Sequence, residues 1–169
     1  MRKLIMLFAA IILESCFTIT ISAQNSASVK GTAVYVVPIT IAKTTDLNFG
    51  IIQIGSTTGT VILTPAGVRS KTGSVTLLSP SGTVQFASFT VSGIPSTTYT
   101  ISLPSSYTIS SGTHNMTVNT FTSSPSGSGI LSSSGSQTIN VGATLNVGAS
   151  QTPGTYTNAS GFNVTVNNN

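Results

Sequence analysis

The chain has 169 residues, only 5% of them charged, and its six basic and two acidic side chains give a formal net charge of +4. Glu14 and Asp46 are the only acids, and there is one histidine and one cysteine. These residues are too few for a hydrolase with paired carboxylates or for a zinc or calcium centre, and we expect no cofactor. Nucleic acid is not expected as a partner either, since too few cations follow the N-terminal segment to track a phosphate backbone: Lys30, Lys43, Arg69 and Lys71.

The first stretch, "MRKLIMLFAAIIL", places two basic residues before an apolar run. This order is typical of a secretory signal peptide, and the run is too short to span a bilayer as a stable helix. We expect residues 1–23 to be removed by cleavage after Ala23. The protein is then exported to the periplasm, the cell surface or the extracellular space. An alternative processing leaves Cys16 as a lipidated first residue.

Residues 24–32 are expected to form an N-terminal extension of a single domain that covers residues 33–169. The extension and the start of the domain carry small or apolar residues at every second position. A β-strand donated to another chain needs this pattern, because alternate side chains fill the partner's groove while the backbone pairs with its edge. From Ala33 onward the same residues could instead form an ordinary first strand. The candidate donor-strand residues are Ala27, Val29, Gly31, Ala33 and Tyr35.

The next run, "AVYVVPITIA", is apolar at both alternating sets of positions. Such a run predicts a strand that is buried on both sides or that crosses between two sheets. Pro38 lies inside it and indicates an edge, a kink or a change of sheet. In "TVQFASFTVSG" the alternation changes phase near Ala87 and Ser88, which predicts a β-bulge.

Period-2 alternation continues in the second half of the chain. "TYTISL" and "GFNVTV" each place apolar side chains on one face. "INVGATLNVGA" is the strongest such run, and it predicts one long bent strand or two strands that meet at the glycines. Turn signals rich in Gly and Pro recur about every ten residues, as in an antiparallel sandwich or barrel. Residues 123–137, "SSPSGSGILSSSGSQ", are expected to form a flexible surface loop.

Few residues offer reactive chemistry. His114 lies in the polar stretch "SSGTHNMTV" and is expected at the surface, and no "GxSxG" motif is present, so an enzyme is not expected. Asp46 is expected to cap a turn or to pair with Lys43. The candidate ligand-binding residues are the local cationic pair of "GVRSKTG" together with one tyrosine: Arg69, Lys71 and Tyr107.

Four stretches in order carry a family resemblance: "AVYVVPITIAKTTDLNFGIIQIG", "GTVILTPAGVRSKTGSVTL", "ASFTVSGIPSTTYTISLP" and "VGATLNVGASQTPGTYTNASGFNVTV". Together they resemble an uncharacterised family of small exported domains of Gram-negative bacteria, some of which are labelled Mat/Ecp-type fimbrial major subunits. The similarity covers about residues 32–166. More loosely, "LNFG" and the closing "GTYT" and "VTV" are similar to spore-coat-U-like and chaperone–usher pilin domains. The chain departs from those patterns in its "VNNN" end and in having no cysteine after Cys16.

The resemblance implies an all-β, antiparallel, immunoglobulin-like (pilin-like) β-sandwich of roughly 8–10 strands. It also implies a structural role at the cell surface and contributes no catalytic residue. The function we expect is a fimbrial or pilus-like subunit that assembles by β-strand complementation. Its partners are then further copies or related subunits, with a periplasmic chaperone or usher as a further partner. The alternative is a monomeric extracellular adhesion or glycan-binding module that uses Arg69, Lys71 and Tyr107.

Overall fold

The structure, a computed structural model, describes residues 25–168. The predicted signal peptide, Cys16 and the cleavage site after Ala23 lie outside the described residues. The chain divides into two units, with the boundary between Tyr35 and Val36. Residues 25–35, called the N-terminal arm below, contain no strand and are described separately from the unit that begins at Val36.

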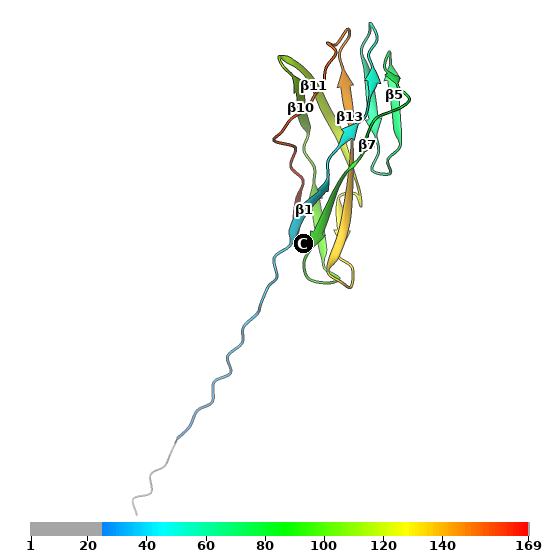
Figure 1. The fold of residues 1–169 in the computed structure, drawn as a ribbon. Helices are drawn as coiled ribbons and strands as arrows, with labels where there is room; N and C mark the ends of the chain where they lie inside the picture. Colours follow the sequence, from blue (N-terminus) through cyan, green and yellow to red (C-terminus); the bar gives the residue numbers. More distant parts are fainter. Residues whose placement is uncertain (1–24, 169) are drawn as a thin grey trace, which may run out of the picture. The chain divides into compact units, whose positions relative to one another are not determined.

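The second unit is an all-β sandwich in which every strand pair is antiparallel, and no helix occurs in residues 25–168 (Figure 1). This confirms the predicted fold class. There are fourteen strands, more than the 8–10 expected, because several are two-residue ribbons. The strands are β1 (Thr40–Thr45), β2 (Asn48–Phe49), β3 (Ile52–Gln53), β4 (Gly59–Leu63), β5 (Arg69–Gly73), β6 (Thr76–Leu77), β7 (Val84–Gln85), β8 (Ala87–Ser92), β9 (Thr98–Ser102), β10 (Ser106–Ser111), β11 (His114–Ser124), β12 (Ser128–Ile130), β13 (Ser136–Val147) and β14 (Thr165–Asn168).

The largest sheet is built around β13. One side of β13 pairs with β11, which in turn pairs with β10. On the other side, residues 136–141 pair with β8 and residues 143–147 pair with β4. β1 extends the sheet beyond β8, and β5 extends it beyond β4. The change of partner at Gly142 divides the sandwich into two halves, which face different second layers.

The lower half contains β1, β8 and residues 136–141 of β13, and its second layer is the three-stranded sheet β12-β9-β14. β14 also contacts β1, so the two layers meet at this edge. The hydroxyl of buried Tyr99 donates a hydrogen bond of 2.7 Å to Oε1 of Gln137, which satisfies the polar end of the ring. The buried side chains of this half are Ala87, Phe89, Val91, Tyr99, Ile101, Leu131, Ile139, Val141 and Val164.

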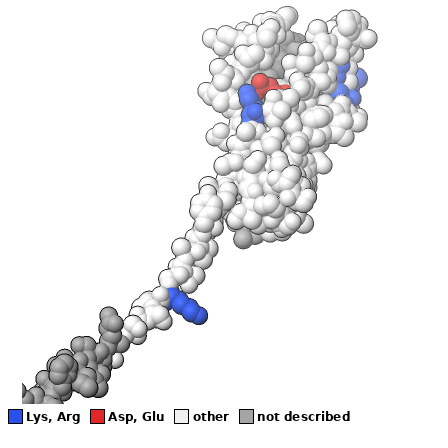
Figure 2. All heavy atoms as spheres, turned by 60° about the horizontal axis from the view of Figure 1, so that its bottom comes forward, with Lys and Arg blue, Asp and Glu red and all other residues white. Residues whose placement is uncertain are grey.

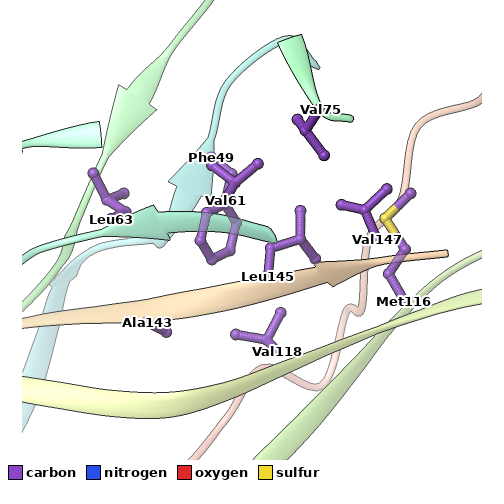
Figure 3. Close-up of a cluster of buried hydrophobic side chains, with 9 residues drawn as sticks. All are labelled: Phe49, Val61, Leu63, Val75, Met116, Val118, Ala143, Leu145 and Val147. Atoms are coloured by element: carbon purple, nitrogen blue, oxygen red, sulfur yellow. The ribbon is translucent and has the colours of Figure 1, made fainter. Parts of the chain in front are cut away.

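The upper half contains β4, β5, β10 and residues 143–147 of β13. Its second layer has two parts: the ribbons β2-β7 and β3-β6, and the irregular residues 152–164. A second cluster of buried side chains lies between these layers, and Figure 3 shows its nine members gathered together, all but Val75 carried by β2, β4, β11 and β13. It consists of Phe49, Val61, Leu63, Val75, Met116, Val118, Ala143, Leu145 and Val147.

One sequence prediction is corrected by the structure. The run "AVYVVPITIA" does not form a buried strand over its length, because Val34, Tyr35 and Val36 are 85%, 86% and 63% exposed. Strand pairing starts only at Thr40, two residues after Pro38. Pro38 has no backbone N–H to contribute to a ladder, and the apolar residues before it find no partner strand within the described chain.

Other predicted strands differ in their limits. The change of phase near Ala87 is not a bulge within one strand but a break at Phe86 between two strands. β7, before the break, pairs with β2 in the second layer, and β8, after it, pairs with β13 in the large sheet. The predicted strand "GFNVTV" shortens to β14, since its partner β9 ends at Ser102. The long run at 139–149 is one strand, not two. Part of the Ser/Gly-rich segment forms β12 and buries Leu131.

Candidate functional site

A groove opens in the upper half, where no strand joins the two parts of the second layer within the described residues, and it extends down to β1 and β8 of the lower half. Its volume is about 1190 Å³, larger than the roughly 300–1,000 Å³ of typical small-molecule pockets. The first wall is formed by residues 46–52 and Ile54, and the second wall by residues 152–164. The floor consists of side chains from the large sheet: Ile41, Ala87, Phe89, Tyr107, Ile109, Met116, Val118 and Leu145.

The two walls run in opposite directions. β1 rises from Thr40 opposite Ser92 to Thr45 opposite Ser88, and the first wall continues upward from its end to the ribbon β3-β6. The second wall descends from Thr157, which forms a bridge with Ser110 near the top, to β14 in the lower half. At its lower end the groove therefore stops where β14 contacts β1.

Arg69 holds the first wall in place from β5. Its Nη1 donates hydrogen bonds to the carbonyl oxygens of Phe49 (2.8 Å) and Ile51 (3.3 Å), and its Nη2 to that of Leu78 (3.4 Å). Gly50 is in the left-handed region with a φ of 75°, and a Cβ there would lie 2.7 Å from Nη1 of Arg69. The wall therefore bends tightly around the guanidinium, and the bend requires glycine.

Tyr107 and Asn158 hold the second wall against β10. The hydroxyl of Tyr107 donates to the carbonyl oxygen of Asn158 (3.0 Å), and Nδ2 of Asn158 donates to the carbonyl oxygen of Thr108 (2.8 Å). Ser110 and Thr157 exchange two backbone hydrogen bonds of 2.9 and 3.0 Å just above. Below, the ring of Phe162 packs edge-on against Tyr107, with the centroids 5.7 Å apart.

Asp46 places a negative charge on the groove. Nζ of Lys43 lies 2.6 Å from Oδ1 of Asp46, and the two side chains are 59% and 79% exposed. This pairing is one of the two roles predicted for Asp46. The pKa of Tyr107 is raised, first by burial and second by the charge of Asp46. The negative charge of Asp46 therefore acts on a side chain of the groove floor. Most of the surface in Figure 2 is uncharged, and Asp46 is the only acid in residues 25–168.

The N-terminal arm carries the candidate donor residues, and all of them are exposed: Ala27, Val29, Gly31, Ala33 and Tyr35. The largest of these side chains, Val29 and Tyr35, are 93% and 86% exposed. A Cβ added at Gly31 would have no atom within 4 Å. The arm therefore offers apolar side chains on both sides of Lys30, its one charged residue.

The three candidate ligand residues do not form one site. Tyr107 lines the groove, Arg69 is engaged with three backbone carbonyls beneath the first wall, and Lys71 is exposed on β5. His114 begins β11 and is not among the residues that line the groove with Asp46. Residues 25–168 contain no group of three or more His, Cys, Asp or Glu able to hold a metal ion. In the same range, no helix is long and apolar enough to cross a membrane.

Sequence reasoning did not find the groove. Its apolar lining, such as Leu47, Ile52 and Phe162, has the same pattern as an ordinary core. The signal that could have indicated it is the second wall, where Pro153, Gly154 and Gly161 interrupt a segment that would otherwise continue as a strand.

A family model described as "Domain of unknown function (DUF4402)" matches residues 39–168. The matched residues include both halves of the sandwich and the groove, and they begin after the N-terminal arm. Comparisons with curated proteins and with solved structures find no match. The family description names no fimbria, so the fimbrial resemblance stays a prediction.

Proposed function

We propose that this chain, which belongs to the DUF4402 family, is a structural subunit of a cell-surface polymer in which the N-terminal arm of one copy fills the groove of the next. The observation that carries the proposal is an exposed apolar arm and an open apolar groove in the same chain. Export from the cell, by way of the expected signal peptide, is part of the proposal. So is a periplasmic chaperone or usher that shields the groove before assembly.

The arm supports the proposal because its exposed side chains are of the kind that soluble proteins bury. Val29, Val34 and Tyr35 are each more than four-fifths exposed. Apolar surface that is contiguous and exposed marks an interaction site. Burial of such side chains in a partner supplies the main favourable term in association, about 25 cal/mol per Å² of apolar surface removed from water.

The groove favours an apolar peptide over a glycan. Its floor is formed by aliphatic and aromatic side chains, and the only charged residues that line it are Lys43 and Asp46. A sugar would need many hydrogen-bonding partners, and the hydroxyl of Tyr107 is already engaged with Asn158. An extended peptide instead places alternate side chains on the apolar floor, while its backbone can form hydrogen bonds along the walls.

Donation of the arm produces an open polymer. Arm and groove are different surfaces of the same chain, so the contact between two copies is heterologous. A heterologous contact that does not close into a ring continues indefinitely, because each added copy offers one free arm or one free groove. This geometry fits a structural role and requires no reactive residue, so we propose no enzymatic activity.

The test is assembly of protein expressed from the full-length sequence, measured by light scattering and electron microscopy. We expect polymers, and we expect Val29→Asp or Tyr35→Asp to abolish them, because a carboxylate on the inward face would be buried without a partner. Thr32→Asp is the matched control, since it adds the same charge on the opposite face and should leave assembly intact.

Folding of each variant is checked by chemical denaturation, because a change in the arm should leave the sandwich unaltered. The measurement is repeated on polymer extracted from the native cells, so that a need for a chaperone or usher is met. A wild-type protein that is monomeric in both settings would refute the proposal. So would polymers that persist in both aspartate variants.

A further inference from the structure

We infer that Lys30 of the donated arm pairs with Asp46 at the groove of the acceptor copy, and that this ion pair fixes the register of the inserted strand. The inference rests on the proposed function and adds to it the contact that positions the strand. Lys30 is the only charged residue of the arm, and Asp46 is the only acid in residues 25–168. The arm thus carries a single cation, and the groove carries a single acid beside Lys43.

Asp46 is accessible to a second cation. Its side chain is 79% exposed, and Oδ1 alone lies within bonding distance of Lys43. A carboxylate accepts several hydrogen bonds through its two oxygens, so Lys43 and an incoming lysine can be bound together. The side chain also lines the groove, so it lies where an inserted strand would pass.

The alternation of the arm directs Lys30 to the correct side. Successive side chains of a strand point to opposite faces. With Val29 and Gly31 directed to the floor, Lys30 points outward to the rim of the groove, where the exposed carboxylate of Asp46 lies. A strand inserted with the opposite face inward would bury Lys30 over the apolar floor, at a high cost in desolvation.

Apolar contacts alone would leave the register open. A slip of two residues keeps the same set of side chains on the floor, because the side-chain period of a strand is two. Ala27, Val29, Gly31 and Ala33 differ in size but all are small or apolar. A single charge pair distinguishes one register from its neighbours, and charge complementarity contributes to register and specificity more than to affinity.

The test is a charge reversal in the full-length chain, with assembly followed by light scattering at low salt. We expect Lys30→Asp and Asp46→Lys each to weaken assembly by about fivefold, because an ion pair that is exposed to solvent contributes only a small free energy. The double variant, in which the pair is restored in reverse, should regain most of the loss. Lys71→Asp makes the same change in net charge on β5 and should have no such effect. The differences should fade at high salt, where exposed charges are screened.

Asp46→Asn removes the carboxylate without placing a second cation beside Lys43, and it should weaken assembly in the same direction. A double variant as weak as the weaker single variant would overturn the inference. An effect of Lys71→Asp equal to that of Lys30→Asp would do the same. In either case, loss of assembly in Val29→Asp would leave the proposed function standing. If Val29→Asp and Tyr35→Asp also assemble normally, the proposed function fails as well.

Discussion

The lower and upper halves of the sandwich share one long strand, β13, and differ in the layer that faces it. In the lower half, β9 and β14 form a continuous sheet that meets β1. In the upper half, two-residue ribbons and the irregular residues 152–164 leave a groove of about 1190 Å³. In both halves the large sheet presents buried apolar side chains to its second layer. The opening of the groove in the upper half therefore arises from strand pairing in the second layer and not from hydrophobic content.

This difference separates the residues that maintain the fold from those that are available for binding. A side chain that is enclosed by both layers of the lower half, such as Ile139, leaves a cavity when it is lost. A side chain on the groove floor has one side open, and its loss removes contact area for a partner. The four predictions below test this separation, in order of decreasing effect on stability.

The largest effect is expected for Ile139→Ala in the lower half. Ile139 is fully buried between the layers, and truncation of a buried isoleucine costs about 2–5 kcal/mol in free energy of unfolding. Ile109→Ala, the same change on the half-buried groove floor, should cost about 1 kcal/mol, since less apolar area is lost. Chemical denaturation of both variants measures the difference. Equal losses would mean that the groove is not open in solution.

The next effect is expected for Gly142→Ala, at the point where β13 changes partner between the halves. A Cβ there would overlap the carbonyl oxygen of Leu63, which is backbone and cannot move without shifting β4. We expect a loss of about 1–3 kcal/mol in unfolding free energy, as for other overpacked sites. Gly31→Ala in the arm, where space is open, is the control and should leave the denaturation midpoint unchanged.

A smaller effect is expected for Arg69→Met, which removes the hydrogen bonds to three carbonyls of the upper half. The expected loss is about 1–2 kcal/mol, because part of the released hydrogen bonding passes to water. Lys71→Met on the same strand is exposed and should stay within about 0.5 kcal/mol of wild type. If both variants unfold alike, Arg69 does not hold the first wall.

The smallest effect is a loss of stability at alkaline pH. Burial raises the pKa of Tyr99 in the lower half, and burial followed by the charge of Asp46 raises that of Tyr107 in the upper half, both from 10.0. The folded state therefore holds these protons more tightly than the unfolded state. Their contribution is fully present below pH 10 and is lost as the pH rises through the folded-state pKa. Denaturation curves across this range should show a shallower decline in Tyr99→Phe and Tyr107→Phe.

The sequence predicted those parts of the fold that depend on local alternation. Ile139, Val141 and Leu145 are buried as expected, because a period of two places them on one face of β13 whatever its partners. Strand ends were harder to predict, since β14 begins only at Thr165, opposite Ser102, the last residue of β9. Pairing partners are a tertiary property and leave no mark in a single strand.

The candidate site was predicted only in part. The arm was identified from its alternation, and the structure places its side chains in solvent. The groove depends on a strand that is absent from the second layer, and its only signal in the sequence is the interruption of residues 152–164 by Pro153, Gly154 and Gly161. The role of Arg69 was also hidden, because its carbonyl partners lie up to 20 residues away in sequence and meet it only after folding.

The antiparallel pairing of β1 with β8 has a mechanical consequence for a polymer of such subunits. In the polymer that we propose, tension on the arm enters the domain near Thr40, at the lower end of β1, while the acceptor groove opens toward the upper half. The pull is then directed along the axis of β1. The hydrogen bonds from Thr40 to Thr45 are sheared together and are not unzipped one after another. If the proposed polymer forms, the load on each subunit falls on a strand of six residues that is held in shear.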